Sequence, residues 1–147
     1  MKIIDGDIFD SNADAIVHQV NCQGVMGAGV ARQVRDKYPN VYVEYRALCD
    51  RYRNNTAALL GYVLGIEFGN VFILNCFAQD GYGAGGCYTD YDALAECFQT
   101  INGAFRGKRI AIPYQIGCGL GGGDWNVVSD IIETELSDCD VTLYRLK

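Results

Sequence analysis

The 147-residue sequence lacks features that would place it in several common classes of protein. It has no apolar run near the roughly 20 residues of a membrane-spanning helix, and its first residues lack the basic and then apolar pattern of a secretory signal. Basic residues are few: 12 Lys and Arg stand against 18 Asp and Glu, a formal net charge of −6. We therefore expect a cytoplasmic protein that does not bind membranes. Because broad nucleic-acid binding needs a basic surface, we also expect no broad binding of nucleic acid.

Metal-binding and disulfide patterns are also missing. The chain has one histidine, His18, and none of its seven cysteines forms a C-x-x-C pair. These counts predict neither a zinc site nor a disulfide framework. We therefore expect no metal and no cofactor, and we interpret most of the cysteines as small buried side chains in a reduced compartment.

The length fits a single domain over residues 1–147, without repeats or linkers. Apolar stretches typical of buried strands alternate with amphipathic stretches, which predicts an α/β fold whose sheet is covered on both faces. Thr89 is expected to cap one helix, and Asp124 stands where the cap of the last helix belongs. The expected strands are residues 2–4, 13–20, 59–66, 71–76, 109–113 and 141–146, and the expected helices are residues 29–37, 39–52, 90 onward and 124–136.

Glycines gather at two points where an expected strand is followed by a helix. Gly24, Gly27 and Gly29 form the first group, and Gly117, Gly119 and Gly121–Gly123 form the second. Such turns let backbone N–H groups approach phosphate oxygens, and the helix N-terminus adds partial positive charge. Two of them at one sheet edge would grip a diphosphate from both sides, so that an acidic protein binds an anion through its main chain. Neither turn is a P-loop or a dinucleotide-binding fingerprint.

Four short motifs stand out along the chain: Gly6-Asp7-Ile8, Val20-Asn21-Cys22, Gly27-Ala28-Gly29-Val30-Ala31 and Ile116-Gly117-Cys118-Gly119-Leu120. They occur in the order found in macrodomains, which the chain resembles over essentially its whole length. The resemblance implies a three-layer α/β/α fold with a mixed, mostly parallel central sheet. The segment from residues 16–24 through Lys37-Tyr38-Pro39 to Tyr45 looks especially like macrodomains that act as ADP-ribose 1''-phosphate phosphatases. Residues 112–125 are similar both to these and to macrodomains that remove ADP-ribose from nucleic acid or protein.

The resemblance also implies a set of ligand contacts. Asp7 and the Ile8 amide would bind adenine, Asn21 would contact the distal ribose, and Tyr144 is the candidate for stacking on adenine. Tyr144 can equally be a sheet tyrosine packed under a helix. Tyr82 is either a lid residue in a mobile loop at residues 77–86 or part of a flexible surface loop without such a role. The full set of implied ligand-binding residues is Asp7, Ile8, Asn21, Gly27, Ala28, Gly29, Val30, Tyr82, Ile116, Gly117, Cys118, Gly119, Leu120 and Tyr144.

Two residues are candidates for catalysis, each with a structural alternative. His18 is either a hydrogen-bonded core residue or an acid, base or nucleophile, since an imidazole titrates near pH ~6.5. Asp124 either only caps the last helix or also directs a water molecule at the distal ribose. Some related hydrolases use a lysine in the loop after the central strand, whereas residues 77–86 contain none, and Gly121 stands where those enzymes can carry a carboxylate.

We expect a hydrolase that acts on ADP-ribose 1''-phosphate. One alternative is a hydrolase that removes ADP-ribose from a macromolecule. The other is a module that binds ADP-ribose without turnover.

Overall fold

The computed structural model describes residues 1–146 and contains one six-stranded sheet with the strand order β1-β6-β5-β2-β4-β3. All neighbouring strands are parallel except β3 and β4, which form an antiparallel hairpin. The strands are β1 (Lys2–Asp5), β2 (Ala15–Asn21), β3 (Val63–Phe68), β4 (Val71–Gln79), β5 (Arg109–Pro113) and β6 (Asp140–Arg145). The helices are α1 (Gly29–Lys37), α2 (Pro39–Arg51), α3 (Tyr91–Ala104) and α4 (Trp125–Glu135), with 3-10 turns η1 (Ile8–Asp10) and η2 (Thr56–Leu59).

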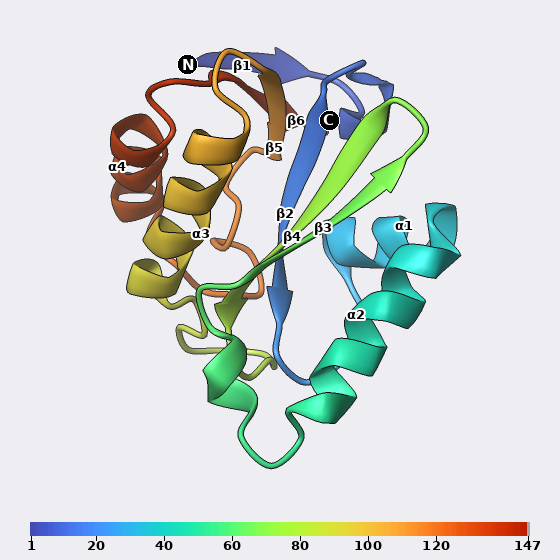
Figure 1. Ribbon diagram of the computed structural model, residues 1–147. Helices are drawn as coiled ribbons and strands as arrows, with labels where there is room; N and C mark the ends of the chain where they lie inside the picture. Colours follow the sequence, from blue (N-terminus) through green and yellow to red (C-terminus); the bar gives the residue numbers. More distant parts are fainter. Residues whose placement is uncertain (147) are drawn as a thin grey trace.

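Helices cover both faces of the sheet, with α3 and α4 on one face and α1 and α2 on the other (Figure 1). This arrangement confirms the expected three layers and the mixed, mostly parallel sheet. Strand β2 has apolar residues on both faces, as a strand between two layers of helices requires. Ala15 and Val17 belong to one buried cluster, and Ile16 and Val20 belong to the other. None of the helices in residues 1–146 is long and apolar enough to span a membrane.

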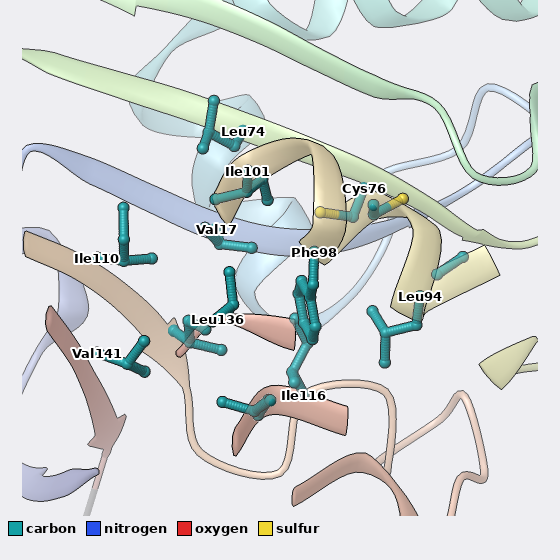
Figure 2. Packing of buried hydrophobic residues seen from close by; sticks show 14 of the residues in the cluster. Val17, Leu74, Cys76, Leu94, Phe98, Ile101, Ile110, Ile116, Leu136 and Val141 are labelled. Atoms are coloured by element: carbon teal, nitrogen blue, oxygen red, sulfur yellow. The ribbon is translucent and has the colours of Figure 1, made fainter. Parts of the chain in front are cut away.

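The cluster under α3 and α4 is the larger of the two cores. Figure 2 shows Leu94, Phe98 and Ile101 of α3 gathered with Val17 and Leu74 of the sheet. Leu94, Phe98 and Ile101 recur at three- and four-residue spacing, which puts them on one side of the helix. Burial of this stripe fixes α3 against the sheet, and with it the segment that leads into its first turn.

Three sequence predictions about element ends were wrong. Residues 59–62 are not strand, because a 3-10 turn ends at Leu59 and β3 begins at Val63. The fourth strand is longer than expected and runs to Gln79, so Phe77 lies in the core instead of in a loop. The cap of α3 is Asp90, whose carboxylate accepts a hydrogen bond from the Ala93 N–H at 3.0 Å, while the Thr89 hydroxyl donates elsewhere.

The strands at the centre of the sheet separate toward their C-terminal ends. β2 pairs with β5 only at Ala15–Ile110 and Ile16–Ala111, after which β2 stays with β4 and β5 stays with β6. A crevice between diverging parallel strands is the usual place for a ligand in an α/β sheet. The segments that follow β2 and β5 are the two glycine-rich turns.

Candidate ligand-binding site

A cavity of about 420 Å³ opens at this edge of the sheet, within the size range of small-molecule sites. Gly27 and Ala28 line it from the turn after β2, and Leu120 and Gly121 line it from the turn after β5. The structure therefore brings the two predicted turns to one cavity. No charged residue stands among the described residues that line it, which are Gln19, Val20, Asn21, Val25, Gly27, Ala28, Ala31, Gln79, Tyr82, Gly83, Ala84, Leu120 and Gly121.

The first turn, residues 22–28, delivers the N-terminus of α1 to the cavity. Ala28 occupies the cap position without a side-chain cap, and the first helical hydrogen bond runs from the Arg32 N–H to the Ala28 carbonyl. The N–H groups of Gly29, Val30 and Ala31 donate to no residue within residues 1–146. Free N–H groups and the helix dipole favour an anion at this point.

Asn21 organises the first turn instead of presenting a free amide. Its side-chain N–H donates to the Val25 carbonyl at 2.7 Å, and its Oδ1 accepts from the Gln23 N–H at 2.9 Å and from the Tyr45 hydroxyl at 2.8 Å. Tyr45 is fully buried. Asn21 lines the cavity, but its polar atoms are already engaged in holding the turn in shape.

The second turn, residues 114–123, also carries unpaired main-chain donors. The N–H groups of Gly119, Leu120 and Gly121 donate to no residue in the described part of the chain. By contrast, the carbonyls of Gly117 and Gly121 point into the protein, where they accept hydrogen bonds from Gly123 N–H at 2.8 Å and from Tyr88 N–H at 2.7 Å. The turn thus leaves these three donors unpaired while its Gly117 and Gly121 carbonyls are bonded within the protein, and it reaches the cavity at Leu120 and Gly121.

Two glutamines that the sequence analysis missed form a wall of the cavity. Gln19 Nε2 donates to Gln79 Oε1 at 2.8 Å and to the Thr89 hydroxyl at 2.9 Å, and Gln79 Nε2 donates to the Gly81 carbonyl. Gln19 Oε1 is buried and has no hydrogen-bond partner among residues 1–146. Their place near the C-terminal ends of strands could have identified them from the sequence. Gln79 ends β4, and Gln19 stands two residues before the end of the neighbouring β2.

The structure does not bring His18 to the cavity. The imidazole lies in the middle of β2 with 1% of its surface exposed, and its Nε2 is 2.5 Å from Asn75 Oδ1. Asn75 Nδ2 donates to the Leu64 carbonyl, so Oδ1 is the acceptor and His18 Nε2 carries the hydrogen. Burial lowers the pKa of His18 to about 4, against an opposing effect of the Asn75 hydrogen bond. His18 is therefore a neutral core residue at neutral pH.

Asp124 is an exposed cap of α4. Its Oδ1 accepts a hydrogen bond from the Asn126 N–H at 2.9 Å, as its sequence position predicts. It follows the second turn directly but does not line the cavity. Its negative charge, after the larger effect of burial, helps to raise the pKa of the Cys118 thiol.

The remaining expected ligand contacts divide into two groups. Tyr82, 54% exposed, and Leu120, 64% exposed, stand at the cavity wall. Asp7 caps η1 through Phe9 N–H, Ile8 is buried, and Tyr144 packs against the core under α1 and α2. None of these last three lines the cavity, nor do the other residues expected at the turns, which are Gly29, Val30, Ile116, Gly117, Cys118 and Gly119.

No cluster of residues suited to a metal ion occurs in the described part of the chain. The buried Cys22 is a poor nucleophile, because burial and the nearby Asp80 carboxylate raise the pKa of its thiol to about 12. The site therefore offers main-chain donors and neutral amides, and no activated thiol.

Comparison with known proteins gave relatives of two kinds, although no protein-family model matches the chain. A DNA ADP-ribosyl glycohydrolase of Mycobacterium tuberculosis is 29% identical over 146 residues, which cover 95% of this chain but only 40% of that protein. An ADP-ribose 1''-phosphate phosphatase of Aspergillus oryzae is 39% identical over 54 residues, 36% of this chain and 27% of the relative. Among solved structures, the macrodomain of Mycobacterium tuberculosis DarG superposes with a TM-score of 0.79 at 27% identity, covering 97% of this chain and 95% of that one.

Proposed function

The chain has the macrodomain fold, and from this premise we propose that it binds ADP-ribose and hydrolyses a bond at the distal ribose. The observation that carries the proposal is the presence of unpaired main-chain donors in both turns that reach the cavity. Two rows of free main-chain N–H groups, at residues 29–31 and 119–121, belong to the two turns that meet at a cavity without charged side chains. A diphosphate between these rows satisfies both, and its charge is balanced by oriented dipoles.

The rest of the ligand follows from the strand order. β1, β6, β5, β2 and β4 are mutually parallel, so Asp7, directly after β1, belongs to the same edge of the sheet as the cavity. We assign adenine to the Asp7 and Ile8 side and the distal ribose to the side of Asn21, Gln79 and Tyr82. The names of both curated relatives contain ADP-ribose or ADP-ribosyl, which supports this ligand.

ADP-ribose 1''-phosphate is the substrate we propose first. In its hydrolysis water attacks phosphorus, the bond between phosphorus and the ribose oxygen breaks, and that oxygen takes up a proton as phosphate departs. We assign proton transfer to Asp124, whose exposed carboxylate uses one oxygen for the helix cap and has a second oxygen for water. His18 has no part in this step, because it is buried and its pKa of about 4 keeps it neutral.

The second candidate is removal of ADP-ribose from a macromolecule. It is favoured by the similarity to the glycohydrolase, which extends over 95% of this chain, whereas the similarity to the phosphatase covers 36%. The net charge of −6 and the carboxylates at Asp80, Asp90 and Asp124 disfavour a nucleic-acid substrate. Binding without turnover is the third outcome, and the uncharged lining of the cavity is consistent with it.

The test is a substrate panel on Asp124→Asn. Asparagine caps helices about as well as aspartate, so this variant keeps the cap and removes the charge. We expect ADP-ribose affinity within about threefold of wild type, and phosphate release from ADP-ribose 1''-phosphate reduced at least about 100-fold, the scale of a lost proton-transfer group.

Asp90→Asn is the matched control, because the Asp90 carboxylate is also the N-cap of its helix, α3. Unchanged turnover in Asp124→Asn would remove Asp124 from the chemistry. Turnover of an ADP-ribosylated protein or DNA, without turnover of the phosphate ester, would favour the second candidate, and binding of ADP-ribose without any turnover the third.

A further inference from the structure

We infer that Thr89 is a positioning residue that holds the turn at residues 117–121 in the conformation that leaves its N–H groups at residues 119–121 unpaired. The inference rests on the proposed function, since it assigns to Thr89 the task of presenting that turn to the diphosphate. Thr89 lies in none of the macrodomain-like motifs of this sequence. It precedes α3, more than 25 residues before the turn in sequence.

Thr89 connects to both ends of the turn. Its hydroxyl donates to the Gly117 carbonyl at 2.7 Å, and its N–H donates to the Gly121 carbonyl at 3.1 Å. The adjacent Tyr88 N–H donates to the same Gly121 carbonyl at 2.7 Å. Thr89 is 7% exposed, so water does not compete for these bonds.

The free donors lie between these two anchored carbonyls. Gly119, Leu120 and Gly121 carry the three unpaired N–H groups. The Gly117 carbonyl precedes these groups in the chain and the Gly121 carbonyl follows them, and both carbonyls are bonded to residues 88 and 89. Because a peptide unit is planar, fixing the Gly117 and Gly121 carbonyls also fixes the N–H groups of Cys118 and Gly122, which flank the three free donors. Anchoring both ends of so short a segment restricts how its middle peptides can rotate.

The turn packs directly on Thr89. A Cβ at Gly121 would lie 2.7 Å from the Thr89 hydroxyl oxygen, and one at Gly117 would lie 3.1 Å from it. Thr89 is itself held: its hydroxyl accepts from Gln19 Nε2 at 2.9 Å, and its backbone forms a bridge with Gln79. The turn therefore rests on a residue that is tied to two neighbouring strands, β2 and β4.

The hydroxyl is not needed for the helix that follows. Asp90 supplies the cap of α3, so loss of the Thr89 hydroxyl leaves the start of the helix intact. This separation makes a selective test possible. Thr89→Val keeps the shape and removes the donor, Thr89→Ser keeps the donor, and Thr100→Val is a control on the exposed side of α3, where the Thr100 hydroxyl bonds only to the Glu96 carbonyl of its own helix.

The experiment measures the affinities of all four proteins for ADP-ribose and for adenosine, which has no phosphate, together with their melting temperatures. We expect Thr89→Val to bind ADP-ribose about tenfold more weakly, the effect of losing one buried hydrogen bond. Thr89→Ser should stay within about threefold of wild type and Thr100→Val should equal it. Adenosine affinity should be unchanged in every variant, because only the diphosphate meets the turn.

Three results would overturn the inference: ADP-ribose affinity in Thr89→Val equal to wild type, a Thr89→Ser variant as weak as Thr89→Val, or equal losses for ADP-ribose and adenosine. If Thr89→Val does not fold, the smaller Thr89→Ala makes the same comparison. A wild-type protein that binds no ADP-ribose would instead overturn the proposed function, and this failure is visible before any variant is made.

Discussion

The two glycine-rich turns use glycine for different reasons. Where the first turn leads into α1, Gly29 has a φ of +58° and a Cβ there would meet nothing within 4 Å. In the second, a Cβ at Gly122 would lie 2.0 Å from the Gly86 carbonyl oxygen, and one at Gly121 would lie 2.7 Å from the Gly117 carbonyl oxygen. The chain is therefore open at Gly29, whereas Gly121 and Gly122 are packed closely against residues 86–89 and the turn's own backbone. A high glycine count therefore does not identify which glycines a phosphate approaches.

Gly29→Glu tests the open side of this comparison and has the largest expected effect. The new carboxylate would stand at the free N–H groups of α1, where it would occupy and repel the site of the diphosphate. We expect ADP-ribose affinity, measured by calorimetry, to fall at least about 100-fold, since like charges in contact cost several kcal/mol.

Gly69→Glu is the matched control. Gly69 has a φ of +60° and also has nothing within 4 Å of its Cβ, but it lies in the β3–β4 hairpin at the opposite edge of the sheet. Both variants carry the same backbone strain and the same added charge. Equal affinity in the two variants would contradict the placement of the site.

Gly122→Ala tests the packed side. The methyl group would collide with the Gly86 carbonyl, and the φ of +73° disfavours any side chain. We expect the free energy of unfolding to fall by about 3 kcal/mol, from overpacking and backbone strain together. Chemical denaturation measures it, and Gly119→Ala, with nothing within 4 Å of its Cβ, should change it by less than about 0.5 kcal/mol. Similar losses in the two variants would remove the distinction between packed and open glycines.

The two catalytic candidates, Asp124 and His18, also differ in how exposed they are. Asp124 follows the second turn and is exposed, whereas His18 precedes the first and is buried. Because the folded-state pKa of His18, about 4, is below its unfolded value near 6.5, the unfolded chain binds a proton that the folded chain does not. This contribution to stability is complete above about pH 6.5 and is lost as the pH falls toward 4.

His18→Gln removes the titrating group and can keep a donor for Asn75. The difference in unfolding free energy between wild type and this variant should therefore change with pH, by up to about 3 kcal/mol between pH 6.5 and 4. Denaturant titrations at several pH values measure this difference. A pH-independent difference would mean that the histidine is not buried in its neutral form.

The sequence predicted the framework well because periodicity and caps are local signals. The helix at residues 29–37 has the predicted bounds, the helix from Pro39 ends one residue early, and both turns reach one cavity. Contacts between distant segments were not predictable in this way. Gln19, Gln79 and Thr89 meet only after β2 and β4 pair and α3 packs, and nothing local distinguishes Thr89 from an ordinary helix cap.

His18 shows the opposite limit. The sequence left it open between a core residue and a catalytic one, whereas in the structure β4 places Asn75 beside it and only 1% of its surface is exposed. Whether a strand residue faces a cavity or the interior depends on the covering layer, which the strand's own sequence does not encode.

The central claim is that main-chain N–H groups of two turns hold a diphosphate in a protein of net charge −6. Titration of the ¹⁵N-labelled protein with ADP-ribose tests it most directly, with the amide resonances of residues 29–31 and 119–121 as the readout. The account predicts that these six resonances shift together, in proportion to bound ligand, and that adenosine leaves them unchanged. Binding of ADP-ribose that shifts neither group would contradict it.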